Sequence, residues 1–292
     1  MSHELPIVPG RGLSTRTATE LRMAFLQKQG LSLDAIGQSQ LDISTIQHNI
    51  ESYIGSTEIP LGIVGPMAFC DGDKSEYVYA PVGTLEGALV ASMNRGAKVV
   101  SRSGGFTATV EWQKMVRTPM LLLRDASFAK PICDWVQQHF NEIKKAAEAY
   151  SNHAKLITID THVLAHCVHL HFVYTTGDAS GQNMTTTCTW HGLLFLVDEL
   201  RSALPDCDFE FIIEGNGASD KKVSSHNIEH GRGIRVTAQC DIPRQVIHEV
   251  LRTTPERMLE FIKPSQEYAK KMGIVTFNVN VANAIAGRTR TQ

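Results

Sequence analysis

Hydrophobic and polar residues recur along the chain with two different periods, which predict a mixture of helices and strands. The clearest helical spacing begins at Thr84, a predicted N-cap, and puts Leu85, Leu89, Met93 and Ala97 on one apolar stripe up to about residue 101. Helical patterns also occupy residues 15–30, 32–47 (as one helix or two short ones), 128–150, 188–204 and 243–262. Strand-like alternation marks residues 76–80, 107–112, 120–124, 156–161, 170–174, 209–213 and 234–241.

The order of these elements predicts an α+β fold with an inserted unit. After a glycine break at SGGF, residues 104–215 read strand, strand, helix, strand, strand, helix, strand. This order is close to a split βαβ, ferredoxin-like unit. We therefore expect an N-terminal helical arm over 1–50, an inserted domain over 104–215, and a larger domain built from 51–103 together with 216–292. Glycines and prolines over 54–66 argue against a helix or a central strand there.

Composition narrows the class of partner. Lys and Arg total 28 against 30 Asp and Glu, so no basic excess indicates nucleic acid or an anionic membrane surface. No apolar run reaches the roughly 18 residues that a membrane span needs. Six cysteines are scattered without a CxxC pair, which favours reduced thiols in a cytoplasmic protein. The pair His162 and His166 would suit a metal only in a helix, whereas its segment reads as a strand, so we expect no metal.

Three polar segments could carry chemistry, although each also has an ordinary interpretation. Glu86 falls in the first turn of the helix predicted from Thr84, where the helix dipole favours a carboxylate, but a surface Glu is common there. Residues 177–184, GDASGQNM, join a strand to a helix whose free N–H groups can bind a phosphate, or form a simple turn. Residues 214–222, EGNGASDKK, place two lysines on a glycine-rich loop that can stabilise an oxyanion, or form a solvated charge cluster.

Taken in chain order, these segments resemble the catalytic domain of 3-hydroxy-3-methylglutaryl-coenzyme A (HMG-CoA) reductases. HNIESYIGSTEIPLGIVGP is similar to that family's entry segment, and PVGTLEGALVASMNRGAK to its glutamate-bearing helix. TTGDASGQNM looks like its cofactor loop and GNGASDKK like its lysine loop, while ERMLEFIKP and FNVNVAN resemble segments that supply a Lys and an Asn. The motifs extend over roughly residues 50–283, and their double Lys resembles the eukaryote-type branch, which tends to use NADPH rather than NADH.

The resemblance implies a role for each matched residue. Glu86 would be the protonated acid near the substrate carbonyl, and burial beside other carboxylates would raise its pKa. Lys221 would stabilise the oxyanion, Asp220 would hydrogen-bond the substrate hydroxyl, and Asn283 would orient Glu86 and Lys221. The remaining contacts would be Arg117, Lys222 and Lys263 to the distal carboxylate, Arg95 and Lys98 to the CoA phosphates, and Asp178, Gln182, Asn183 and Met184 to the nicotinamide nucleotide.

The implied protein is a homodimer with its active site at the interface. It would reduce an acyl-CoA thioester to an alcohol with NADP(H), by default HMG-CoA to mevalonate in isoprenoid biosynthesis. The fold implied is a reductase-like large domain with an inserted ferredoxin-like nucleotide-binding domain.

Three departures from the family pattern keep other interpretations open. The printed sequence ends at RTRTQ, before the family's GQD aspartate and its flap histidine. Glu214 stands where the family has a serine that helps hold the substrate carboxylate, and a second carboxylate is expected to repel it. The stretch KPSQEYAKKMGIVTF has fewer glycines than the family's. One alternative is a changed substrate, or non-redox acid–base chemistry by Glu86 and Lys221, in a specialised biosynthetic pathway. Another is a degenerate, non-catalytic binding protein.

Overall fold

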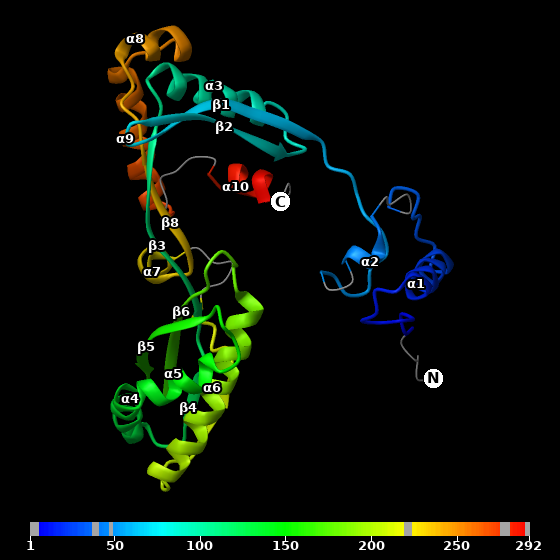
Figure 1. Cartoon of the computed structure of the whole chain (residues 1–292), viewed down its shortest axis with the longest axis vertical. Helices are drawn as coiled ribbons and strands as arrows, with labels where there is room; N and C mark the ends of the chain where they lie inside the picture. Colours follow the sequence, from blue (N-terminus) through cyan, green and yellow to red (C-terminus); the bar gives the residue numbers. More distant parts are fainter. Residues whose placement is uncertain (1–5, 37–40, 47–48, 219–223, 275–280, 290–292) are drawn as a thin grey trace. The chain divides into compact units, whose positions relative to one another are not determined.

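The structure is a computed structural model of the chain, and it describes residues 6–36, 41–46, 49–218, 224–274 and 281–289 (Figure 1). The predicted roles of Asp220, Lys221 and Lys222 therefore fall outside the described residues. The chain divides into two compact units. The first comprises residues 1–64, 79–94 and 280–292, and the second comprises residues 65–78 and 95–279. The predicted insert over 104–215 lies wholly within the second unit, while its boundaries stay a prediction.

The N-terminal helical arm of the first unit is held by one buried arginine. Helix α1 (Arg16–Lys28) is the helix predicted for 15–30, and the Thr15 side chain accepts a hydrogen bond from the Ala18 amide at its start. Arg22 on α1 is 1% exposed and donates to the carbonyl oxygens of Tyr53 at 2.8 Å and Gly10 at 2.5 Å. Within the described part of 32–47, the predicted helix is confined to α2 (Ile43–Ile46).

A hairpin and one long helix follow the arm. Strand β1 (Leu61–Asp71) pairs with β2 (Lys74–Gly83) in a two-stranded sheet, so β1 is an edge strand, which its glycines and proline tolerate. Helix α3 (Leu89–Arg102) begins later than predicted. The Thr84 hydroxyl accepts from the Glu86 amide at 2.9 Å in a tight turn, and Ala88 adopts a positive φ of 67°. Thr84 is therefore not the N-cap, and Glu86 precedes the helix.

The second unit contains a six-stranded antiparallel sheet. Its strands are β3 (Thr107–Arg117), β4 (Met120–Leu123), β5 (Lys155–Leu164), β6 (Cys167–Thr175), β7 (Phe209–Ile212) and β8 (Gly233–Gln239). They pair in the order β7-β4-β6-β3-β8, with β5 on the other side of β6. The predicted sequence of strands and helices over 104–215 is confirmed by the order of these elements.

Three helices cover one face of this sheet (Figure 1). A short 3₁₀ turn, η1 (Ala126–Phe128), leads into α4 (Ala129–Gln138) and α5 (Phe140–Glu148), which replace the single helix predicted over 128–150 because the chain breaks at His139. Helix α6 (Gln182–Ala203) completes the layer. Strand alternation sends Val168, Leu170, Phe172 and Tyr174 of β6 into the core against these helices, each 0% exposed.

The opposite face of the sheet carries histidines. His171 projects from β6 on the side away from the core, and His162 of β5 lies opposite His169 of β6 in the strand register. Helix α7 (Ser225–His230), which the sequence did not predict, brings the His226 ring centroid to 5.6 Å from that of His171. The predicted helix over 243–262 is divided into α8 (Arg244–Val246), the π-helical turn η2 (Ile247–Leu251) and α9 (Pro255–Lys271), because Arg252 adopts a left-handed φ of 55°.

Candidate active site

The first unit brings together two predicted site residues that are far apart in sequence. Asn283 lies on α10 (Val281–Thr289), and its side-chain amide donates to Glu86 Oε2 at 3.1 Å. The helix approaches the end of β2 closely, since a Cβ placed on Gly287 would lie 2.7 Å from Val82 Cγ1. Both side chains are exposed in the single chain, so the predicted burial of Glu86 is not seen here. The contact joins two residues that the resemblance linked, and the orienting role of Asn283 stays a prediction.

The predicted nucleotide-binding residues lie at the first turn of α6. The helix begins at Gln182, earlier than predicted, so Gln182, Asn183 and Met184 occupy its first turn, while Asp178 lies in the preceding loop. Gly181 enters the helix with a φ of 70°, and a Cβ there would lie 2.5 Å from Thr176 Cγ2. The first backbone N–H groups of a helix have no partner within it, so this turn offers donors and a positive dipole end to an anion.

Arg117 lies beneath this turn. Its guanidinium is 5% exposed and donates to Thr186 Oγ1 at 2.8 Å and to the Gln182 carbonyl at 3.1 Å. Arg117 also donates to the Val116 carbonyl at 3.3 Å. Its contact with the substrate carboxylate, which the resemblance implied, stays a prediction. A buried cation at this position adds to the positive end of the helix dipole.

The other predicted cationic contacts are accessible. Arg95 and Lys98 lie on α3, and both side chains are exposed. Lys263 lies on α9, also exposed. Accessible ammonium and guanidinium groups can reach an anionic ligand, but none of the three has a described contact with another predicted site residue.

Glu214, flagged in the sequence as a possible source of repulsion, is an exposed residue whose carboxylate also accepts hydrogen bonds within the second unit. Its Oε1 accepts a hydrogen bond from the Thr118 hydroxyl at 2.7 Å, and the Ala218 amide donates to the same oxygen at 3.5 Å. Thr118 is 0% exposed and belongs to the turn between β3 and β4. Sequence reasoning missed Thr118, because no local signal links two residues that are 96 positions apart.

A cluster of imidazole rings lies beside residues 214–218, and the sequence predicted only part of it. Ring centroids of His162 and His171 are 4.4 Å apart, and those of His226 and His230 are 5.2 Å apart. Burial is the main cause that lowers the pKa of His171 to about 4, and the neighbouring His162 and His226 contribute to this shift. Burial and the adjacent His230 and His162 also lower the pKa of His226. The close spacing of histidines over 162–171 was visible in the sequence, but the contribution of α7 was not.

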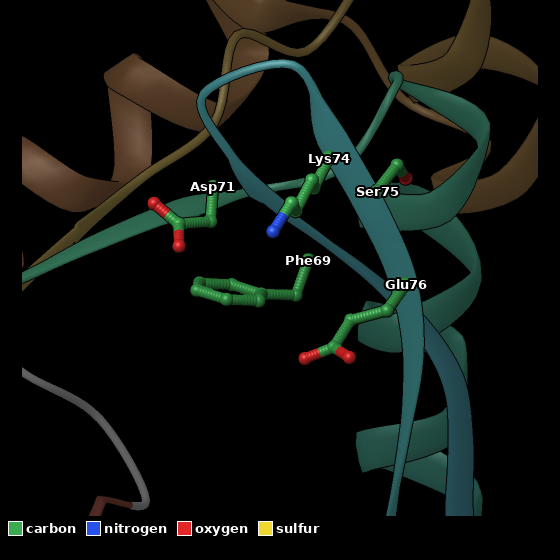
Figure 2. Close-up of a pocket in the computed structure, with 5 residues that line it drawn as sticks. All are labelled: Phe69, Asp71, Lys74, Ser75 and Glu76. Carbon is green, nitrogen blue, oxygen red and sulfur yellow. The ribbon is translucent and has the colours of Figure 1, made fainter.

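One hollow in the described surface lies away from these residues. It has a volume of about 390 Å³ near the turn of the β1–β2 hairpin. Figure 2 shows the Phe69 ring between the carboxylates of Asp71 and Glu76, with Lys74 and Ser75 completing the lining. No predicted site residue lines it. Among the described residues, no group of three or more His, Cys, Asp or Glu side chains is arranged to hold a metal ion. No described helix combines the length and the apolar character that crossing a membrane requires.

The chain is similar to known proteins over most of its length. A family model described as hydroxymethylglutaryl-coenzyme A reductase matches residues 18–289. The 3-hydroxy-3-methylglutaryl-coenzyme A reductase of Haloferax volcanii is 36% identical over 272 residues, which cover 92% of this chain and 66% of that protein. The reductase of Methanothermobacter thermautotrophicus is 33% identical, with 92% and 67% covered. The chain thus spans about two thirds of the length of these relatives.

Solved structures agree on the fold. A 3-hydroxy-3-methylglutaryl-coenzyme A reductase from Streptococcus pneumoniae superposes with a TM-score of 0.56 at 18% identity, covering 86% of this chain and 56% of that one. A second structure of the class II enzyme from that organism, described as bound to NADPH in open conformations, gives a TM-score of 0.55 at 18% identity, covering 86% and 64%. The matched proteins are oxidoreductases with a mixed helix and sheet fold. The chain described here belongs to the hydroxymethylglutaryl-coenzyme A reductase family.

Proposed function

We propose that the protein reduces 3-hydroxy-3-methylglutaryl-CoA to mevalonate and free CoA, with two molecules of NADPH as the hydride donors. The observation that carries the proposal is the hydrogen bond from Asn283 to Glu86, which joins residues 197 positions apart in the pair that the family resemblance implied. Hydride attack on a thioester carbonyl builds negative charge on oxygen. Glu86 would supply a proton to that oxygen, Lys221 would stabilise it, and Asp220 would hydrogen-bond the substrate hydroxyl.

The nucleotide-binding part of the proposal is supported by the start of α6. We assign Asp178, Gln182, Asn183 and Met184 to the nicotinamide nucleotide, with the buried Arg117 guanidinium beneath them adding positive charge. We further propose that residues 104–215 form a ferredoxin-like domain. The antiparallel order β7-β4-β6-β5, with α4 and α5 between β4 and β5 and α6 between β6 and β7, supports this assignment.

The substrate contacts and the assembly complete the proposal. Arg95 and Lys98 would bind CoA phosphates, and Lys222 and Lys263 would bind the distal carboxylate, all as exposed or loop cations that can reach an anion. We infer a homodimer with the active site at its interface. Exposed apolar side chains support this inference, including Val236 at 50% and Ile234 at 60% on β8 and Phe261 at 59% on α9.

One assay tests the function directly. Purified protein is mixed with HMG-CoA and NADPH, and the loss of NADPH absorbance is followed in time. We expect turnover that Glu86→Gln and Lys221→Ala each reduce by at least about a hundredfold, because each removes a group used in the transition state. Glu58→Gln, an exposed carboxylate in the same unit, serves as the matched control. Binding of NADPH without any consumption would contradict the proposal and favour a binding protein.

A further inference from the structure

The stem of the lysine loop, residues 214–218, is tied to a single buried threonine. Thr118 Oγ1 donates to Glu214 Oε1 at 2.7 Å and accepts from the Gly217 amide at 3.0 Å. The Thr118 carbonyl accepts from the Gly215 amide at 2.6 Å. One fully buried residue therefore makes three hydrogen bonds to the stem, from both its side chain and its backbone.

The stem also lies flat against the histidine-bearing face of the sheet. A Cβ added to Gly215 would lie 2.6 Å from Met120 Cβ, and one added to Gly217 would lie 3.1 Å from His171 Nε2. A larger residue at Gly215 would therefore force the stem or the strand to shift, and one at Gly217 would fit only tightly. The stem ends at Ala218, which is 2% exposed, two residues before Asp220.

The described chain after the predicted lysines, which begins at Ser224, also leads to His171. Ser224 caps α7 by accepting a hydrogen bond from the Asn227 amide at 3.2 Å. The next turn carries His226, whose ring lies against His171, the residue that Gly217 contacts on the near side. Residues 218 and 224, which flank Asp220, Lys221 and Lys222, are thus both anchored near His171.

We propose that Thr118 and Glu214 are positioning residues for Lys221: they fix the stem, residues 214–218, from which the chain continues to this proposed catalytic residue. This inference rests on the proposed function. It also gives Glu214 a role that its negative charge did not suggest, since its carboxylate is occupied by the Thr118 hydroxyl and the Ala218 amide. A displacement of about 1 Å in a group that acts in the transition state is enough to cost roughly a hundredfold in rate.

Proteolysis tests whether Thr118 and Glu214 hold the stem in place, and this test does not require enzyme activity. Trypsin cleaves after lysine, so the rate of cutting after Lys221 and Lys222 compares the access of the protease to these two bonds between variants. Thr118→Val keeps the shape but removes the hydroxyl, and we expect cleavage there to become about tenfold faster or more, because the two hydrogen bonds of the hydroxyl to the stem are lost. Thr118→Ser retains the hydroxyl and should restore slow cleavage. Glu210→Ala, on β7 with its carboxylate paired to exposed Arg124, is the matched control.

A kinetic comparison tests the role in catalysis. We expect Thr118→Val and Glu214→Ala to lower kcat about tenfold or more, with KM for the thioester and the Kd for NADPH changing less than about threefold. Thr118→Ser and Glu214→Gln, which retain a donor and an acceptor, should recover most of kcat. Equal cleavage and equal kcat in folded Thr118→Val, verified by its circular dichroism spectrum, would overturn the inference. An inactive wild-type chain would instead refute the proposed function. Proteolysis would still decide whether Thr118 and Glu214 hold the stem.

Discussion

At the scale of single residues, the core of the second unit contains a buried hydroxyl pair. Tyr174 Oη and Thr189 Oγ1 are 2.9 Å apart, and both residues are 0% exposed. Burial raises the pKa of Tyr174, which therefore stays neutral. We expect Tyr174→Phe to lower the free energy of unfolding by about 1–2 kcal/mol, because Thr189 loses its partner away from water. Urea denaturation followed by circular dichroism measures this, with exposed Tyr150→Phe as control; equal losses in both variants would contradict it.

Individual residues also show which features of the candidate active site the sequence could and could not predict. Matching the motifs in order was enough to pair Asn283 with Glu86, because family motifs record contacts between distant positions. The same approach did not reveal the hydrogen bonds of Glu214, and its expected repulsion of a substrate carboxylate stays a prediction. Its partner Thr118 is set by the register of β3, β4 and the loop after β7, and nothing near either residue in the sequence reveals it.

At the scale of elements, the start of α6 depends on the conformation of one glycine. Gly181 and Gly177 both have positive φ, 70° and 61°, but only Gly181 would bring a Cβ into collision, with Thr176. We expect Gly181→Ala to destabilise the protein by about 1–3 kcal/mol more than Gly177→Ala and to weaken NADPH binding, because the first turn must shift. Thermal unfolding and NADPH titration of the two variants provide the comparison. Identical behaviour would show that α6 does not require this close approach.

The histidines on the sheet face opposite the core predict that the stability of the protein depends on pH. His171 faces His162, His226, His169 and Asp160, and burial as the main cause lowers its pKa from 6.5 to about 4. The unfolded chain then binds more protons than the folded chain between these values, so stability present above about pH 6.5 is lost as the pH falls towards 4. We expect a contribution of about 1–2 kcal/mol to the loss between pH 7 and pH 5, which His171→Asn should remove.

Urea unfolding at the two pH values measures this difference. His153→Gln, an exposed histidine outside the cluster, is the control and should leave the wild-type pH dependence unchanged. A His171→Asn variant that still loses as much stability as the wild type on acidification would show that His171 is not responsible.

Element type was predicted more successfully than element limits. The strand and helix order of residues 104–215 followed from periodicity, since each element buries one face. The start of α6 was missed because three consecutive threonines disfavour a helix. In the structure their hydroxyls donate to carbonyls of the preceding turn, including Thr185 to Gly181 at 2.9 Å and Thr187 to Asn183 at 3.2 Å. The break between α4 and α5 at His139 interrupts a continuous apolar stripe, so the pattern alone could not reveal it.

At the scale of the whole molecule, the described surface of the second unit exposes apolar strand positions. Every residue of β8 is exposed, and its partner β3 exposes Val110 at 63%. A β-ribbon with both faces in water is poorly stabilised alone, which supports a partner over it.

Replacing Ile234 and Val236 with Lys should therefore shift a homodimer to monomers, measured by sedimentation velocity. Lys replacement of exposed Tyr150 and Ile157 is the control, and an unchanged dimer would place the interface elsewhere.

An active site shared between two subunits predicts that two inactive variants regain activity when they form mixed dimers. If Glu86 of one subunit acts with Lys221 of the other, inactive Glu86→Gln and Lys221→Ala proteins should complement each other. Unfolding and refolding them together at equal amounts gives half heterodimers, each with one site carrying both intact residues and one carrying neither. Activity should then return to about a quarter of the wild-type value. Sites built within one subunit would leave every mixture inactive, because each chain lacks one of the two groups. Mixing without subunit exchange is the control, and its activity should stay at the background of the separate variants.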